Sequence, residues 1–154
     1  MIQARRGKTV ALRGFRKDAR GQASVEFILT VVFLVLFILG MIEVVMMVYT
    51  YSVLADSAKE GVRYAVVHGS GNSSGSGPGC SDSTGANVKT QVTNYAQYSF
   101  HSTSAMTVNV SYPDSACTAP SRVRVTVSYP YQPFFGLGWP TVTVRAAAEG
   151  RIAY

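Results

Sequence analysis

Hydrophobic side chains dominate one continuous stretch of the chain, from Phe27 to Val48, which reads FILTVVFLVLFILGMIEVVMMV. Glu43 is its only ionisable residue. At 1.5 Å per residue, a helix over this stretch is about 33 Å long, slightly more than the thickness of the hydrocarbon core of a bilayer. The pattern therefore predicts a helix that spans a membrane.

The helical spacing continues beyond this run. From Val53 to Val66, apolar and small residues recur on one side of a helix and charged residues take the other side. The apolar and small positions are Val53, Leu54, Ser57, Ala58, Gly61, Val62 and Ala65, and the charged positions are Asp56, Lys59, Glu60 and Arg63. We predict one long helix from about Ser24 to Val67, with its first half in lipid and its second half amphipathic.

Residues 69–85 have a different composition. They are mostly Gly, Ser and Pro, and Cys80 is their only apolar residue. A segment of this kind buries little surface and is typical of a flexible surface loop. A phosphate-binding loop carries a lysine followed by Ser or Thr, and this segment has no such pair.

The rest of the chain predicts a short helix followed by strands. From Ala86 to about Phe100, one helical face carries Val88, Val92, Tyr95, Ala96 and Ser99. Residues 106–112, 122–129 and 141–148 alternate polar and apolar positions and are rich in Val and Thr, as half-buried strands are. We predict an α+β fold, in which a three- or four-stranded antiparallel sheet is covered on one face by the two helices.

The segment between the last two predicted strands, PYQPFFGLGWP, is unusually rich in large apolar residues. In one interpretation, Phe134, Phe135 and Trp139 fold back onto the edge of the sheet as part of the core. In the other, the segment from Tyr131 to Trp139 is a contact surface for a partner subunit or for the lipid interface. The sequence leaves both open.

Basic residues are concentrated at the start of the chain. The formal net charge of +6 resides in residues 1–21, which hold seven basic side chains and one acidic one, while the remainder is balanced. A basic arm beside an apolar helix sets membrane orientation, with the arm in the cytoplasm and the chain after Tyr51 on the far side. We therefore expect membrane lipid, and not nucleic acid, as a partner.

The two cysteines, Cys80 and Cys117, both lie in the part predicted to be exported. Oxidising conditions there allow a disulfide, which stabilises the fold by about 4 kcal/mol on the chain-entropy model. The alternative is two free thiols. A zinc site is not expected, because His68 and His101 are too distant from the cysteines in sequence to give the usual ligand spacing.

A carboxylate, Glu26, stands at the start of the apolar run, five residues after Gly21. Such a charge costs a few kcal/mol near the membrane core unless it is paired, hydrated or at the interface. A basic leader that ends in glycine, followed by four residues and then Glu-Phe, resembles the type IV prepilin processing site. The resemblance implies that a prepilin peptidase cuts after Gly21, so that the mature chain begins at Gln22. It also implies that Glu26 pairs with the free α-amino group of a neighbouring subunit.

The resemblance extends through Glu26-Phe27, the second acidic residue Glu43 and the segment AKEGVRYAVV that ends at Val67. In this order of features the chain resembles TadE-like proteins of the Flp (Tad) pilus assembly system. This implies a minor pilin or pseudopilin in the bacterial inner membrane, with a periplasmic C-terminal domain and a structural role in adhesion or secretion machinery. The implied partners are the prepilin peptidase, other pilin-like subunits and pilus assembly proteins.

Glu43 lies about 25 Å beyond Glu26 along the predicted helix, in the outer part of the bilayer. One interpretation is that its side chain snorkels to the headgroups. The other is that it pairs with a basic group on a partner helix.

These patterns divide the chain into a basic leader that is removed (1–21), a transmembrane helix (22–51), an amphipathic extension (52–68), a Gly/Ser-rich loop (69–85) and an extracytoplasmic α+β domain (86–154). The alternative to a pilin is a signal-anchored periplasmic binding module that is never cut. No motif brings a nucleophile and a base together, so we expect neither enzyme activity nor a cofactor.

Overall fold

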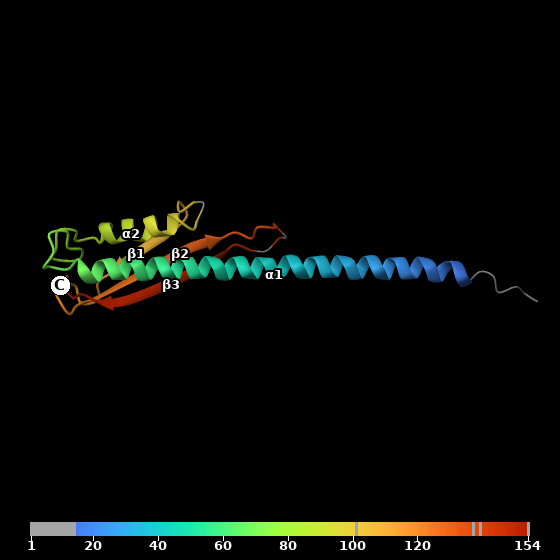
Figure 1. The fold of residues 1–154 in the computed structure, drawn as a ribbon, viewed down its shortest axis with the longest axis horizontal. Coiled ribbons are helices and arrows are strands. Elements are labelled where there is room, and N and C mark those ends of the chain that lie inside the picture. The colour runs from blue at the N-terminus through green and yellow to red at the C-terminus, as the bar shows by residue number, and fades with distance from the viewer. Residues whose placement is uncertain (1–14, 101, 137, 139, 154) are drawn as a thin grey trace, which may run out of the picture. The chain divides into compact units, whose positions relative to one another are not determined.

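The computed structural model describes residues 15–100, 102–136, 138 and 140–153, with side chains from Gly21 onward. The elements are α1 (Phe15–Val67), α2 (Ala86–Gln97), β1 (Thr107–Ser111), β2 (Arg122–Tyr131) and β3 (Val142–Arg151) (Figure 1). The predicted α+β class is confirmed. The chain divides into two compact units between Met41 and Ile42, inside α1, and each unit is described separately below.

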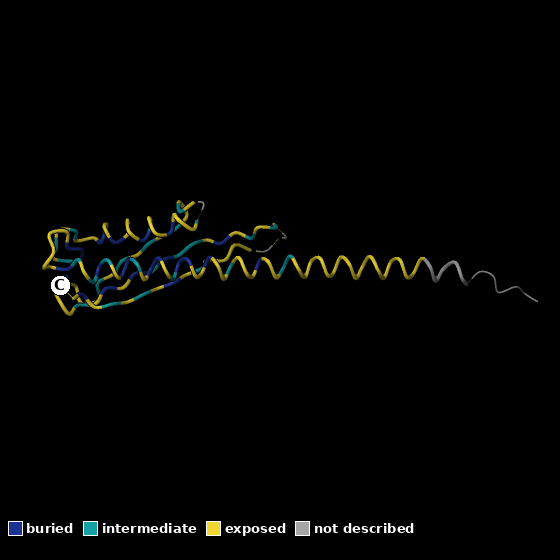
Figure 2. The backbone as a smooth tube through the Cα atoms, in the orientation of Figure 1, coloured by how far each residue is buried: buried dark blue, intermediate teal, exposed yellow. Residues whose placement is uncertain are grey.

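In the N-terminal unit, α1 begins at Phe15, earlier than the predicted start near Ser24. The difference is physically reasonable, because the Arg and Lys residues before Gly21 are good helix formers. From Gly21 to Ile38 every residue is exposed, as the yellow tube of Figure 2 shows. By length and composition, α1 from Gly21 onward is apolar enough to cross a membrane.

In the C-terminal unit, residues 42–154, the strands form one antiparallel sheet in the order β1-β2-β3. Val110 is opposite Val125 and Val127 is opposite Ala146. The predicted three- or four-stranded sheet therefore has three strands in the described residues. β2 continues to Tyr131 and β3 to Arg151, beyond their predicted ends, while the other strand ends agree with the prediction to within one residue.

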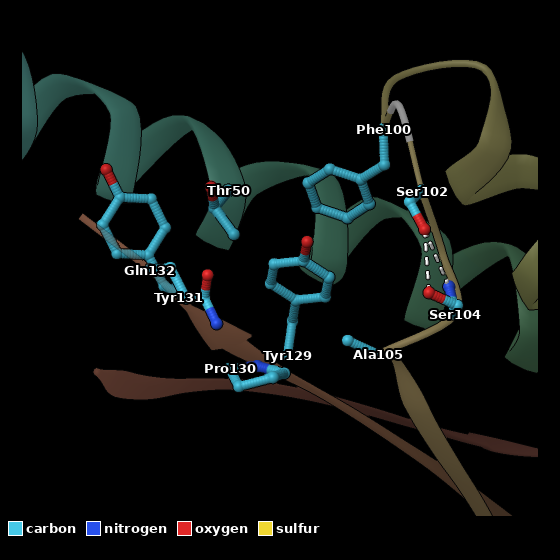
Figure 3. A pocket seen from close by; sticks show the side chains of 9 residues that line it. All are labelled: Thr50, Phe100, Ser102, Ser104, Ala105, Tyr129, Pro130, Tyr131 and Gln132. Carbon is cyan, nitrogen blue, oxygen red and sulfur yellow. Dashed lines mark hydrogen bonds between the residues drawn. The ribbon is translucent and has the colours of Figure 1, made fainter. Parts of the chain in front are cut away.

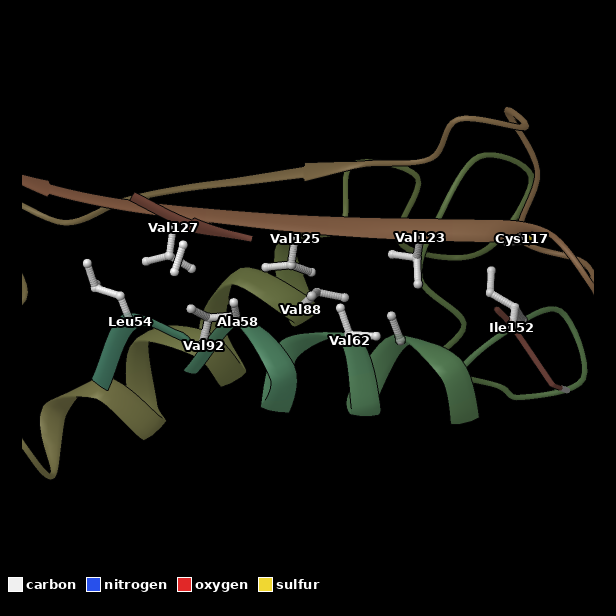
Figure 4. Close-up of a cluster of buried hydrophobic side chains, with 12 residues drawn as sticks. Leu54, Ala58, Val62, Val88, Val92, Cys117, Val123, Val125, Val127 and Ile152 are labelled. Carbon is white, nitrogen blue, oxygen red and sulfur yellow. The ribbon is translucent and has the colours of Figure 1, made fainter. Parts of the chain in front are cut away.

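The core of the C-terminal unit lies between the sheet and the two helices (Figure 4). The predicted packing face of α1 is confirmed. The buried residues of this core are Leu54, Ala58, Val62, Ala65, Val88, Val92, Cys117, Val123, Val125, Val127, Ala146 and Ile152. Gly61 is required where α1 meets α2, since a Cβ at this position would overlap Cγ2 of Val92. The prediction placed Tyr95 and Ser99 on the packing face of a helix that continues to about Phe100, but both are exposed. The helix α2 ends at Gln97, before Ser99, and its buried face consists of Val88, Val92 and Ala96.

The Gly/Ser-rich loop differs from the predicted flexible surface loop, because part of it is buried. Gly75, Ser76 and Gly77 are buried, and Ser76 N donates to His68 O at 2.8 Å. Backbone N–H groups of the loop donate to carbonyls within it and to those of His68 and Cys117, and glycines let it pack closely where apolar side chains are lacking. The cysteines at Cys80 and Cys117 are joined by a disulfide with a Cα–Cα distance of 6.1 Å.

Asp82 ties this loop to the start of α2. Its carboxylate accepts hydrogen bonds from Asn87 N at 2.8 Å, Ser76 Oγ at 2.8 Å and Ala86 N at 3.0 Å. Burial alone raises the pKa of Asp82, but the hydrogen bonds outweigh it and lower this pKa to about 2. The ionised Asp82 carboxylate therefore satisfies the first two N–H groups of α2, although the N-cap residue itself is Gly85.

Candidate functional site

The predicted processing site, Gly21 and Gln22, lies on α1 and is exposed. A Cβ placed on Gly21 would meet no atom within 4 Å. Packing therefore does not require glycine here. Glycine inside a helix weakens it by roughly 0.5–1 kcal/mol relative to alanine, so the helix opens more readily at this point. An exposed, locally weak backbone is what a peptidase needs in order to reach the bond.

Glu26 and Phe27 follow one and a half turns later, and both are exposed. The side chain of Phe27 is 69% exposed. The backbone oxygen of Glu26 accepts a hydrogen bond from Thr30 Oγ1 at 2.9 Å, but its carboxylate has no hydrogen-bond or ion-pair partner among the described residues. A carboxylate at the head of an apolar helix is thus left available to a group from another molecule.

Glu43 has a very different environment within the C-terminal unit. It is only 3% exposed. Its Oε1 accepts hydrogen bonds from Tyr131 Oη at 2.7 Å and from the backbone N of Phe134 at 2.9 Å. Its Oε2 is buried and has no hydrogen-bond partner among the described residues. We call Glu43, Tyr131 and Phe134 the Glu43 cluster.

The Glu43 cluster corrects one of the two interpretations drawn from the sequence. Snorkelling is wrong, because the carboxylate is buried and accepts hydrogen bonds from Tyr131 and Phe134 of its own chain. Pairing with a basic group on a partner helix stays a prediction. The hydrogen-bond donors to the Glu43 carboxylate in the structure belong to its own chain. They are 88 and 91 residues away in sequence, so the sequence pattern did not predict the contact.

Tyr131 is the central residue of this cluster. It is 7% exposed. Burial first, and then the hydrogen bond to Glu43 and the charge of Glu43, raise the pKa of Tyr131 to about 12. Its hydroxyl therefore remains a donor over the whole physiological range.

The aromatic segment after β2 is not folded back as core at Phe134, whose side chain is 77% exposed. The rings of Phe134 and Phe135 contact each other edge to face, with centroids 5.2 Å apart. Trp139 lies outside the described residues. The interpretation of this segment as core is therefore wrong at Phe134, where the side chain points away from the protein interior.

Two hollows flank Tyr131. The first, of about 320 Å³, is drawn in Figure 3, where the stacked rings of Phe100 and Tyr129 form one side and Ser102 and Ser104 lie at its edge. The second, of about 190 Å³, lies between Met46 and Tyr49 of α1 and Phe134. In the described residues, no group of three or more His, Cys, Asp or Glu side chains is placed to hold a metal ion.

Fold and site together define a small α+β domain carried by a helix that is long and apolar enough to span a membrane, consistent with a single-pass membrane protein. Residues 21–63 match a family model described as TadE-like protein. This match confirms the resemblance inferred from the sequence. It begins at the predicted processing glycine, contains both Glu26 and Glu43, and supports a role associated with the Tad pilus in general. No curated protein and no solved structure matches the chain.

Proposed function

We propose that this protein is a minor pilin or pseudopilin of TadE-like type that takes part in the assembly of a Flp (Tad) pilus. One observation carries the proposal. Inside the matched region, Glu26 is exposed and has no partner among the described residues, five residues after Gly21 and at the head of an exposed apolar helix. Such an arrangement is costly for an isolated chain in lipid and suits a subunit that receives a partner.

The proposed sequence of events begins with hydrolysis of the peptide bond between Gly21 and Gln22 by a prepilin peptidase. Water is added across the bond, which leaves a carboxylate on Gly21 and an α-amino group on Gln22. At neutral pH this amino group carries a proton for most of the time, since its ordinary pKa is about 7.7–8.0. Processing thus creates a positive charge that pairs with Glu26 of a neighbouring pilin-like subunit.

The exposed apolar residues of α1 supply the remaining surface for assembly. From Val25 to Ile38 the large apolar side chains are between 42% and 69% exposed. In lipid, these side chains pack equally well against acyl chains or against another helix, so the Glu26 pair decides the register between subunits. The proposed role is structural, and no catalytic step is assigned to this chain.

The proposed orientation places the basic N-terminus in the cytoplasm and the C-terminal unit in the periplasm of a bacterial inner membrane. The disulfide between Cys80 and Cys117 supports this orientation, since disulfides persist in oxidising compartments. The excess of basic residues before Gly21 supports it independently.

The test is intact-mass and N-terminal peptide analysis of the protein purified from membranes that contain the peptidase. We expect a mature chain that begins at Gln22, and a full-length chain when Gly21→Phe blocks the site. Gly40→Phe is the matched control, because it makes the same substitution further along α1 and is expected to leave processing intact. A wild-type chain that keeps residues 1–21 would reject the proposal in favour of an uncleaved, signal-anchored binding module.

A further inference from the structure

We propose that the Phe134 loop, residues 132–136, inserts into the outer leaflet of the membrane and acts as a second lipid anchor beside α1. The inference rests on the membrane insertion given under the proposed function. It concerns a part of the chain that the family match does not cover, since that match ends at residue 63.

The first argument is the position of the loop along the helix. Phe134 N donates to Glu43 Oε1 at 2.9 Å, and Tyr131 Oη donates to the same oxygen at 2.7 Å. These two bonds fix the loop beside the last turns of the apolar run, not beside the amphipathic part that begins at Val53. A lipid that surrounds α1 at Glu43 therefore also reaches the Phe134 loop.

The second argument is the surface of α1 at the same level. The outward side chains of Ile42, Val44, Val45, Met46 and Val48 are between 42% and 64% exposed. The side chains of Tyr49 and Tyr51, which come next, are each 50% exposed and suit the headgroup region. Phe134, at 77% exposed, extends this apolar surface sideways from the helix onto the domain.

The third argument is charge. From Val44 to Ala55 on α1, and from Gln132 to Val144 around the loop, the sequence contains no Asp, Glu, Lys, Arg or His. The one acid at this level, Glu43, accepts a hydrogen bond from Phe134 N of the loop and another from Tyr131 Oη at the end of β2. The loop thus shields a carboxylate that would otherwise face lipid, and it presents apolar side chains in its place.

The hollow of about 190 Å³ between α1 and the loop is suited to a lipid acyl chain. Met46, Tyr49 and Phe134 contribute to its lining, together with Phe100 and Tyr131. A flexible acyl chain fills an irregular apolar hollow of this kind without a specific partner. Lipid is favoured over a protein partner for two reasons. The apolar surface is continuous with that of the helix proposed to span the membrane. The surface also carries no charged residue that could orient a protein partner through an ion pair.

The consequence is a fixed orientation of the C-terminal unit. A helix alone leaves the domain free to rotate about the helix axis above the membrane. A second contact, displaced from that axis, holds one side of the domain at the surface. The rest of the domain, including the outer face of the sheet, is then presented to other subunits in one fixed orientation.

The test uses tryptophan fluorescence of the full chain in phosphatidylcholine vesicles whose acyl chains carry quenching bromine atoms either near the headgroups or near the methyl ends. Trp139, the only tryptophan, is first replaced by Phe. Three variants of this background then carry one reporter each, by Phe134→Trp, by Val35→Trp in the apolar run, or by Val67→Trp. Val67 lies about 36 Å beyond Glu43 along α1. Retention of the Cys80–Cys117 disulfide and of the helical circular dichroism checks that each variant is folded.

We expect bromines near the headgroups to quench the reporter at position 134 roughly twofold, as for an aromatic residue at the interface. Bromines near the methyl ends should quench it less, the reporter at 35 should be quenched strongly, and the reporter at 67 should be unaffected. Quenching at 35 without quenching at 134 would overturn the loop inference and leave the proposed insertion standing. A blue-shifted but unquenched signal at 134 would overturn it in favour of a protein occupant, such as a second copy. Absence of quenching at 35 would remove the membrane insertion on which both rest.

Discussion

Glu26 and Glu43 are two carboxylates on one apolar helix, and their surroundings are opposite. Glu26 is exposed, and its carboxylate has no partner among the described residues. Glu43 is 3% exposed, and its carboxylate accepts two hydrogen bonds from its own chain. Hydrogen bonds to a charged group contribute about 1.5–3 kcal/mol each, and leaving such a group unpaired in lipid costs a similar amount. The chain thus satisfies one acid itself and leaves the other for a different molecule.

The difference separates folding from assembly. Substitutions at Glu43 should act on the C-terminal unit, because its partners lie at the end of β2 and in the Phe134 loop. Substitutions at Glu26 should act only where subunits meet. Each prediction below tests whether these two effects can be separated.

The largest effect on subunit assembly is expected at Glu26. Glu26→Gln removes the charge but keeps the size and a hydrogen-bonding group, so the pair with the α-amino group of a processed neighbour is lost. We expect incorporation into pili or pilus-assembly complexes to fall at least about tenfold, which corresponds to about 1.4 kcal/mol. Cross-linking of the mature subunit in membranes measures the loss. Glu43→Gln is the matched control, and an equal loss in both variants would contradict the division of roles.

The largest effect on the stability of the C-terminal unit is expected at Glu43. Glu43→Leu removes the carboxylate acceptor of the partly buried Phe134 backbone N–H and of the buried Tyr131 hydroxyl, which keeps only its longer bond of 3.4 Å to Glu43 O. A fully buried group left without an acceptor costs about 1–3 kcal/mol, so two such groups would cost about 2–6 kcal/mol. Because the Phe134 N–H is only partly buried, we expect the free energy of unfolding to fall by about 2–4 kcal/mol. Glu43→Gln keeps an acceptor oxygen and should cost about half as much. Denaturant unfolding in detergent micelles measures both, and Glu26→Leu should leave this free energy unchanged.

A smaller effect is expected at Tyr131. Tyr131→Phe removes one of the two donors to Glu43 and keeps the ring, so we expect a loss of about 1–2 kcal/mol in the free energy of unfolding. Combining it with Glu43→Leu should cost less than the sum of the two single changes, because the acceptor is already missing. Strict additivity in this double-mutant cycle would show that the hydrogen bond does not contribute to stability.

The sequence predicts well those features that depend on nearby residues. The packing face of α1 from Val53 to Ala65 and the alternation of Val123, Val125 and Val127 on β2 follow from local periodicity, and both are confirmed. The Glu43 cluster could not be found in this way, because Tyr131 Oη and Glu43 Oε1 are 88 residues apart in sequence. The two-residue alternation does continue through Tyr129 to Tyr131 and could have placed Tyr131 on the inner face. The predicted strand ends at Tyr129, and the next residue, Pro130, is of a type that normally interrupts a sheet.

Composition was misleading in the Gly/Ser-rich loop for a related reason. Few side chains in residues 69–85 can be buried, and the sequence therefore predicts a surface segment. In the structure, Ser76 is fully buried because its backbone N and its hydroxyl both find partners, in His68 O and Asp82 Oδ2. Backbone hydrogen bonds of this kind leave no periodic signal in the sequence.

The smallest effect under ordinary conditions is a pH dependence at Tyr131. Its pKa is raised from 10.0 to about 12, chiefly by burial and then by Glu43. A raised pKa in the folded state means that the neutral hydroxyl stabilises the fold. This contribution is complete below pH 10, the pKa of the unfolded chain, and is lost as the pH rises through 12. We expect the free energy of unfolding of the C-terminal unit to fall between these pH values, together with a rise in tyrosinate absorbance at the high end of the titration. Tyr131→Phe should remove this part of the stability loss and this part of the absorbance rise. If the variant keeps the same alkaline transition, a group other than Tyr131 controls it, and the hydrogen bond that covers Glu43 is not sensitive to pH in this range.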